Sequence, residues 1–175
     1  MFSPDRYVAA LRFAAARHRD QRVTGTDLPY VTHVVSVAAE VIAAISLDPA
    51  VDHDLAVTCA LLHDTLEDTQ TRHDELAAVF GTAVADAVQA LTKDKSVPDP
   101  MGDSLHRIRA QPREIAIVKL ADRITNLAPP PESWSVDKRR AYRAEALVIL
   151  DALAQASAPL AVRLRARADA YAAFC

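Results

Sequence analysis

The segment from Ala60 to Thr69 places four side chains suited to metal binding and acid–base chemistry close together. His63 and Asp64 follow an apolar run, and Glu67 and Asp68 come one helical turn later. If the helix continues, all four share one face, because residues three and four apart are neighbours on a helix. Three carboxylates repel one another unless a cation lies between them, and nitrogen with carboxylate oxygen suits a divalent first-row metal. The alternative interpretation is a solvated helix end.

Two further segments carry polar groups on otherwise apolar faces. His33 lies in a run of valines, and Asp122 lies in an amphipathic stretch where Lys119 and Asn126 fall on the same face. Taken singly, His33 is typical of a core histidine and Asp122 of a buried ion pair with Arg123 or another arginine. Three helices that each aim costly polar groups from an apolar stripe are better explained by a shared site.

The composition predicts the elements that must position these groups. The chain has 175 residues, 51% hydrophobic, with 35 alanines, nine aromatic residues and three glycines. Such a length can bury a core without disulfides, and this composition favours an all-α fold. We expect one domain over residues 1–175, a bundle of about eight to ten helices. The three glycines, Gly25, Gly81 and Gly102, cannot form a glycine-rich phosphate loop, so any phosphate must be held by other means.

Charge and cysteine content restrict the binding partners and the cellular compartment that we expect for the protein. A net charge of −3 argues against a general nucleic-acid binder, which normally carries a basic face. Cys59 and Cys175 do not make a disulfide framework and fit a reducing compartment. The longest uncharged stretch, 28–39, is shorter than the roughly 20 residues of a membrane helix. We therefore expect a cytoplasmic protein without nucleic-acid or membrane partners; the oligomeric state stays open.

Hydrophobic periodicity, caps and prolines predict where the helices lie. A proline- and glycine-containing stretch, 93–103, is expected to be a mobile loop, and the prolines at 129–131 are expected to interrupt the bundle. The expected helices run over about 4–21, 30–46, 49–62, 71–80, 82–92, 112–127, 136–156 and 159–173.

With these residues assembled, the sequence resembles a known family. His33, the His63-Asp64 pair and the distant Asp122 match the H…HD…D signature of the HD superfamily of metal-dependent phosphohydrolases. The runs His-Asp-Thr-Leu-Glu-Asp at 63–68 and Lys-Leu-Ala-Asp-Arg-Ile-Thr-Asn at 119–126 resemble the hydrolase domain of RelA/SpoT-type alarmone enzymes. The single-domain length makes the chain most similar to the small alarmone hydrolases of that type.

The resemblance implies an activity and a set of roles. The activity is Mn²⁺-dependent hydrolysis of the 3′-pyrophosphate of (p)ppGpp or (p)ppApp, giving the parent nucleotide and pyrophosphate. The metal ligands implied are His33, His63, Asp64 and Asp122. Glu67 and Asp68 match the acidic pair that orients water, acts as general base and assists the leaving group. The residues implied to contact the small-molecule nucleotide substrate are Arg22, Lys95, Asn126, Trp134, Lys138 and Tyr142.

Two departures from the family pattern concern the substrate. The arginine usual two residues after Gln21 is Val23 here, so either Arg22 takes over its role or the substrate is held differently. The loop after Lys95 is less basic than in relatives, which predicts a weaker preference for extra 5′ phosphates, or a shifted base preference.

Two alternative functions remain open from the sequence. One is an HD phosphatase acting on another nucleotide phosphate, such as NADPH or a nucleoside monophosphate. The other is a non-catalytic nucleotide-binding module. The presence of Glu67 and Asp68 argues against the latter, because a sensor does not need the acid–base pair.

Overall fold

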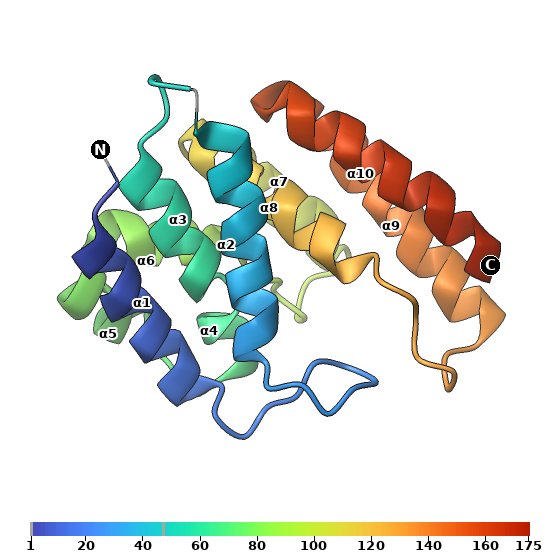
Figure 1. Ribbon diagram of the computed structural model, residues 1–175, viewed down its shortest axis with the longest axis horizontal. Coiled ribbons are helices and arrows are strands. Elements are labelled where there is room, and N and C mark those ends of the chain that lie inside the picture. The colour runs from blue at the N-terminus through green and yellow to red at the C-terminus, as the bar shows by residue number, and fades with distance from the viewer. Residues whose placement is uncertain (1, 47) are drawn as a thin grey trace.

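The computed structural model describes residues 2–46 and 48–175 and is helical throughout its regular elements (Figure 1). The described residues contain no β-strand; the one β-type pairing among them is an isolated bridge between Arg22 and Pro29. The predicted all-α fold is confirmed. The helices are α1 Pro4–Arg17, α2 Val31–Ile45, α3 His53–Leu62, α4 Thr65–Asp68, α5 His73–Phe80, α6 Thr82–Leu91, α7 Pro100–Arg109, α8 Arg113–Asn126, α9 Val136–Leu153 and α10 Ala158–Tyr171, with short 3₁₀ turns Ala154–Ala156 and Ala172–Phe174.

Side-chain caps fix where several helices begin. In each, a Ser or Asp oxygen accepts a hydrogen bond from a backbone N–H three residues on, which satisfies one of the free donors of the first turn. The capped helices begin at slightly different residues from those expected. Helix α3 begins after Asp52 rather than at 49, and α10 begins after Ser157 rather than at 159. The capping residues are Ser3, Asp52, Asp99, Ser135 and Ser157.

The expectation of a loop over 93–103 is wrong at its C-terminal end, where α7 begins at Pro100. Asp99 caps this helix by accepting from the N–H of Gly102, and Pro100 occupies the first turn, where its missing N–H costs nothing. The proline and glycine read as breakers are therefore start signals. The first helix is shorter than expected: the prediction extends it to about residue 21, and it ends at Arg17.

Helix α8 is the centre of the bundle. Its residues 114–124 are all buried, and it packs against α2, α3, α9 and α10. A helix buried on every side is expected to be apolar all round, yet α8 carries Lys119, Asp122 and Arg123 inside this buried stretch. Buried charges of this kind require partners, and α2 and the end of α3 lie beside them.

The segment between α1 and α2 folds back on itself as a short extended pair. Val23 N–H donates to the Leu28 carbonyl at 2.9 Å, and Tyr30 N–H donates to the Gln21 carbonyl at 3.0 Å. Side chains alternate along an extended chain, so Gln21 and Val23 point to one side and Arg22 points to the other. Gly25 turns the segment with φ +78°.

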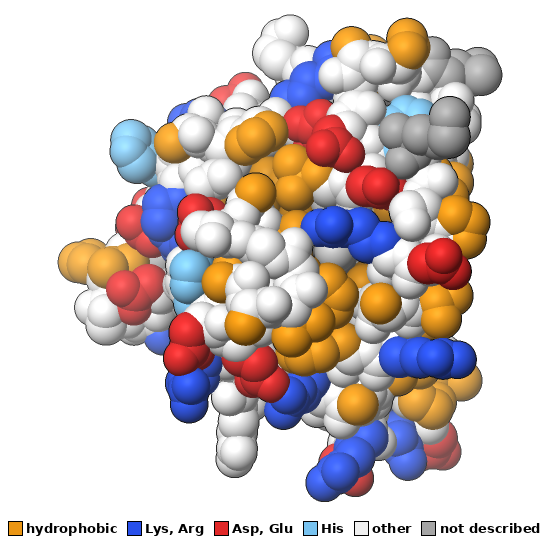
Figure 2. Space-filling view, turned by 90° about the vertical axis from the view of Figure 1, so that its left-hand side faces the viewer, with side chains coloured by type: hydrophobic (Ala, Val, Ile, Leu, Met, Phe, Trp, Pro, Cys, Tyr) orange, Lys and Arg blue, Asp and Glu red, His pale blue; other side chains and the backbone are white. Residues whose placement is uncertain are grey.

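The surface mixes hydrophobic and charged groups. Figure 2, which shows the left-hand side of Figure 1, has acidic and basic side chains interspersed among hydrophobic ones. Ion pairs such as Arg17–Glu75, between α1 and α5, tie helices together at the surface. Among the described residues, no helix combines the length and hydropathy needed to span a membrane.

Replacement of Gly25 tests the close packing of this segment. A Cβ at position 25 would lie 2.7 Å from Cγ of Pro131, whereas a Cβ at Gly81, also at positive φ, would meet nothing within 4 Å. Gly25→Ala and Gly81→Ala both incur backbone strain of about 1–3 kcal/mol, because both glycines lie at positive φ. We expect Gly25→Ala to lower the free energy of unfolding by about 1–2 kcal/mol more than Gly81→Ala in denaturant titrations. Equal losses would show that the contact with Pro131 is not tight.

Candidate metal and acid–base site

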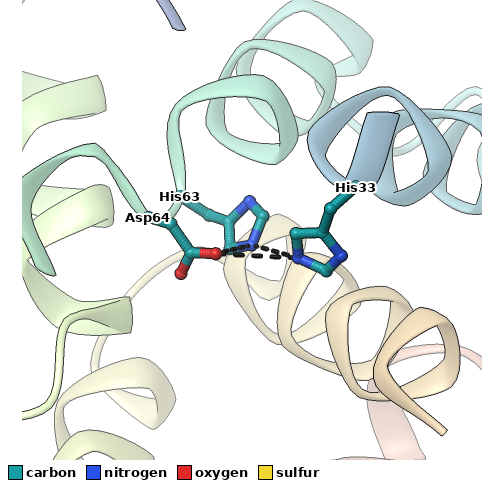
Figure 3. A group of neighbouring side chains, drawn as sticks. All are labelled: His33, His63 and Asp64. Atoms are coloured by element: carbon teal, nitrogen blue, oxygen red, sulfur yellow. Dashed lines mark hydrogen bonds and ion pairs between the residues drawn. The ribbon is translucent and has the colours of Figure 1, made fainter. Parts of the chain in front are cut away.

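Four side chains from separate parts of the fold meet at one point. The Nε2 atoms of His33 and His63 lie 3.3 Å apart, and Asp64 Oδ2 lies 2.9 Å from His63 Nε2 and 3.6 Å from His33 Nε2 (Figure 3). Asp122 Oδ1 lies 3.4 Å from His33 Nε2 and 3.6 Å from His63 Nε2. Two imidazole nitrogens and two carboxylate oxygens therefore converge, and they are a donor set that fits a divalent cation.

The chain delivers these groups from α2, the α3–α4 junction and α8. His33 is in the first turn of α2, and Asp122 is in the last part of α8. The helix containing 55–62 does not continue to Asp68 as the spacing argument supposed. Helix α3 ends at Leu62, and Asp64 precedes the short α4, so His63 and Asp64 occupy a break between two helices.

Both histidines use their other ring nitrogen for an orienting contact. His63 Nδ1–H donates to the Ala60 carbonyl at 2.8 Å, which leaves the Nε2 lone pair for the site. Thr125 Oγ1 donates to the Asp122 carbonyl, so at 3.5 Å from His33 Nδ1 it acts as acceptor for that ring. Such contacts fix the tautomer and orientation of metal-binding imidazoles.

Asp122 is held by two neighbours on its own helix. Lys119 Nζ lies 3.2 Å from Oδ2, and Asn126 Nδ2 donates to Oδ1 at 2.5 Å, so the shared face inferred from the spacing is real. Burial opposes ionisation, but Lys119 and the imidazoles outweigh it and hold the pKa of Asp122 well below its usual range. The alternative of an Asp122–Arg123 pair is wrong, because Arg123 donates to Glu145 at 2.6 Å.

Asp64 is ionised for a similar reason. Burial raises the pKa of its carboxyl, but the adjacent His63 and His33 outweigh burial and lower the pKa to about 2. Burial lowers the pKa of His63, but the carboxylates of Asp64 and Asp122 outweigh burial and raise this pKa above its usual value. Tyr30 Oη donates to Asp64 Oδ2 at 2.5 Å, and burial together with Asp64 raises the pKa of this phenol, so it remains a donor.

Glu67 and Asp68 lie on α4 but outside the four-residue cluster. Glu67 Oε2 accepts a hydrogen bond from the Lys93 N–H at 2.9 Å, and Asp68 Oδ2 accepts one from Gln21 Nε2 at 2.9 Å. Glu67 is half-buried and Asp68 is exposed. Each carboxylate is thus oriented by a non-helical segment and keeps a free oxygen that can accept a proton.

The sequence analysis did not identify three residues as neighbours of the site: His18, Gln21 and Tyr30. His18 is 2% exposed; its Nδ1 lies 2.6 Å from Gln21 Oε1, and its ring lies 4.8 Å from the ring of Tyr30. The Tyr30 ring lies 5.2 Å from that of His33. The available signal was spacing: His18 and Gln21, like Tyr30 and His33, are three residues apart.

The expected nucleotide contacts fall into separate groups. Trp134, Lys138 and Tyr142 form one cluster, with ring centroids of Trp134 and Tyr142 5.0 Å apart and Lys138 Nζ 4.2 Å from the Trp134 centroid. The Arg123 guanidinium lies 4.6 Å from the Tyr142 centroid, which joins this cluster to α8. Lys95 is exposed and lines a cavity with Glu67.

Asn126 and Arg22 differ from expectation in their surroundings. Asn126 uses its amide on Asp122, so it positions a candidate metal ligand as well as lying where substrate contact was expected. Arg22 is exposed on the face of its segment opposite Gln21 and Val23. Its role in place of the cation expected at Val23 stays a prediction.

The fold and this site define a class of protein, the HD-domain hydrolases. The HD domain family matches residues 10–158, and the chain belongs to that family. The expected membership of the HD superfamily is confirmed.

Comparison with individual relatives shows to which members of the HD family the chain is similar. The chain is 36% identical over 140 residues to guanosine-3′,5′-bis(diphosphate) 3′-pyrophosphohydrolase MESH1 of Danio rerio, covering 75% of each chain. It is 34% identical over 145 residues to MESH1 of Homo sapiens, covering 76% of each. A solved structure described as a metazoan ortholog of SpoT that hydrolyses ppGpp superimposes with a TM-score of 0.81 at 27% identity, covering 95% of this chain and 96% of that one. The expected relationship to small RelA/SpoT-type hydrolases is confirmed.

Removal of Lys119 tests the charge balance of the site. Lys119→Met leaves the Asp122 carboxylate buried without its ammonium partner, and we expect the metal-free protein to lose about 3 kcal/mol of unfolding free energy. The double variant Lys119→Met, Asp122→Asn is expected to recover most of that loss, because the uncompensated charge is gone. Chemical denaturation of the three proteins measures both effects; a single variant as stable as the wild type contradicts this account.

Proposed function

We propose that this chain hydrolyses the 3′-pyrophosphate of ppGpp in the presence of Mn²⁺, and that pppGpp and the adenosine counterparts are also substrates. Residues 1–175 act as a single hydrolase domain in this proposal, in a reducing compartment such as the cytoplasm. The observation that carries it is the convergence of His33, His63, Asp64 and Asp122 beside two further carboxylates. The names of the MESH1 relatives supply the substrate class.

The four converging side chains are the proposed metal ligands. Both imidazoles have Nδ1 engaged elsewhere and Nε2 directed into the cluster, and both aspartates are ionised. When bound there, a divalent cation supplies charge neutralisation for phosphate and makes water a better nucleophile near neutral pH. Lys119 and Tyr30 hold the two carboxylates in place.

Glu67 and Asp68 are the proposed acid–base pair. The water oxygen bonds to the phosphorus attached to the 3′ oxygen, and the bond between that phosphorus and the 3′ oxygen breaks. A carboxylate of the pair takes the proton from water, and the 3′ oxygen leaves as a hydroxyl after protonation, so the products are the parent nucleotide and pyrophosphate. The hydrogen bonds from Lys93 N–H and Gln21 orient the pair for these transfers.

Substrate contacts come from several walls of the site. Lys95, beside Glu67 in a cavity of about 510 Å³, provides positive charge for phosphate. Trp134 and Tyr142 offer aromatic faces for the base, and Lys138 lies against the Trp134 ring. Asn126, which donates to Asp122, is the proposed ribose contact.

The direct test is incubation of the purified protein with ppGpp, pppGpp and their adenosine counterparts in Mn²⁺, followed by product chromatography. We expect release of intact pyrophosphate and the parent nucleotide, with activity lost on chelation and restored by Mn²⁺. NADPH and nucleoside monophosphates serve as competing substrates. Release of single phosphate, or no turnover by metal-loaded protein, would overturn the proposal.

Neutral amides at the acid–base pair separate catalysis from metal binding. Glu67→Gln and Asp68→Asn are each expected to lower kcat about 10²-fold or more, because the amide cannot accept the proton. The rise in melting temperature on adding Mn²⁺ should persist in both, since neither residue belongs to the four-residue cluster. Asp74→Asn, at an exposed carboxylate on α5, is the matched control and should keep full activity. Survival of activity in both acid–base variants would refute their assigned role.

A further inference from the structure

A second cavity opens on the other side of the metal site from Lys95. Its volume is about 470 Å³, and its lining includes Val23, His33, Thr125, Glu40 and Arg167. His33 is shared between this cavity and the four-residue cluster, so the cavity lies next to the cluster. Arg167 belongs to α10, which packs against both α8 and α2.

Arg167 is the positive charge available in this cavity. It is exposed, and among the described residues it makes neither a hydrogen bond nor an ion pair. The acidic residue of the lining, Glu40, is already neutralised: Arg163 Nε and Nη2 lie 2.6 and 2.5 Å from its two carboxylate oxygens. The cavity therefore presents an uncompensated guanidinium, a group that binds phosphate well.

The opposite wall of the cavity contributes no charge. Val23 faces it, and Arg22 points away because of the alternation along the extended segment. The positive charge on this side of the site thus comes from the last helix, which the sequence motifs do not include.

We propose that Arg167 binds the 5′ phosphate of the nucleotide whose 3′ end lies at the metal site. The proposal rests on the proposed function, because it takes a nucleotide phosphorylated at both ends as the ligand. Arg167 is a specificity residue here: it contacts a phosphate remote from the bond that breaks.

Equilibrium binding tests this without turnover. Guanosine 3′,5′-bisphosphate and guanosine 3′-monophosphate share a 3′ phosphate and differ only in the 5′ phosphate, and chromatography after each titration verifies that neither probe has been hydrolysed. Calorimetry with the Mn²⁺-loaded wild type is expected to show tighter binding of the bisphosphate. Arg167→Gln should weaken bisphosphate binding about tenfold and leave monophosphate binding within twofold, because only the former loses a charged hydrogen bond.

Two matched variants control the measurement. Arg165→Gln removes an exposed arginine from the same helix, outside the lining of this cavity, and should bind both probes as the wild type does. Arg167→Lys keeps the charge and should retain most of the preference for the bisphosphate.

The outcomes separate this proposal from the function on which it rests. Equal effects of Arg167→Gln on the two probes, or a wild type that does not prefer the bisphosphate, would overturn the role of Arg167. An Arg167→Lys variant as weak as Arg167→Gln would also overturn it. Failure of the wild type to hydrolyse ppGpp would overturn the proposed function alone, because the binding comparison needs no turnover.

Discussion

The structure depends on keeping the Nε2 atoms of two imidazoles within 2.9–3.6 Å of each other and of the two carboxylates in a largely buried place. Taking such groups from water is costly unless each has partners. Here each has one outside the cluster: Lys119 for Asp122, Tyr30 for Asp64, the Ala60 carbonyl for His63 and Thr125 for His33. Helices α2, α3 and α8 must therefore pack in one register, because a shift between them would separate Tyr30 from Asp64 and Thr125 from His33.

The proposed metal ligands and the proposed acid–base pair are supported differently. The four converging side chains lie on or beside well-packed helices, with α8 buried on all sides. Glu67 and Asp68 are instead oriented by contacts from segments outside the helices, through the N–H of Lys93 and the amide of Gln21. A fixed site for the cation combined with separately held carboxylates suits a reaction in which the phosphate is positioned first and protons move afterwards.

The residue types and spacings were enough to predict the all-α fold, most helix positions and which groups converge. His33, His63, Asp64 and Asp122 could be grouped because each is costly on an apolar face. What the sequence could not give depends on tertiary contacts. Lys119 and Arg123 are equally plausible partners of Asp122 by type, and packing places Arg123 against Tyr142 and Glu145. The contact of Tyr30 with Asp64 spans 34 residues, and that of Gln21 with Asp68 spans 47. The start of α7 was misread because Asp99 caps a helix whose first residue is a proline.

The scarcity of glycine has a structural counterpart. A glycine-rich loop binds phosphate with backbone N–H groups, whereas this chain has three separate glycines, and Gly25 and Gly81 occupy turns at positive φ. Phosphate must then be held by side chains. Two cavities offer basic ones: Lys95, Lys93 and Arg107 line the cavity beside Glu67, and Arg167 lines the cavity beside His33. Positive charge on both sides of a metal site matches a substrate with phosphates at both ends better than one with a single phosphate. Lys95 lies in the segment before α7, and Arg167 lies on α10. A substitution at either position therefore changes the charge of its cavity without altering α2, the α3–α4 junction or α8, which carry the four converging side chains.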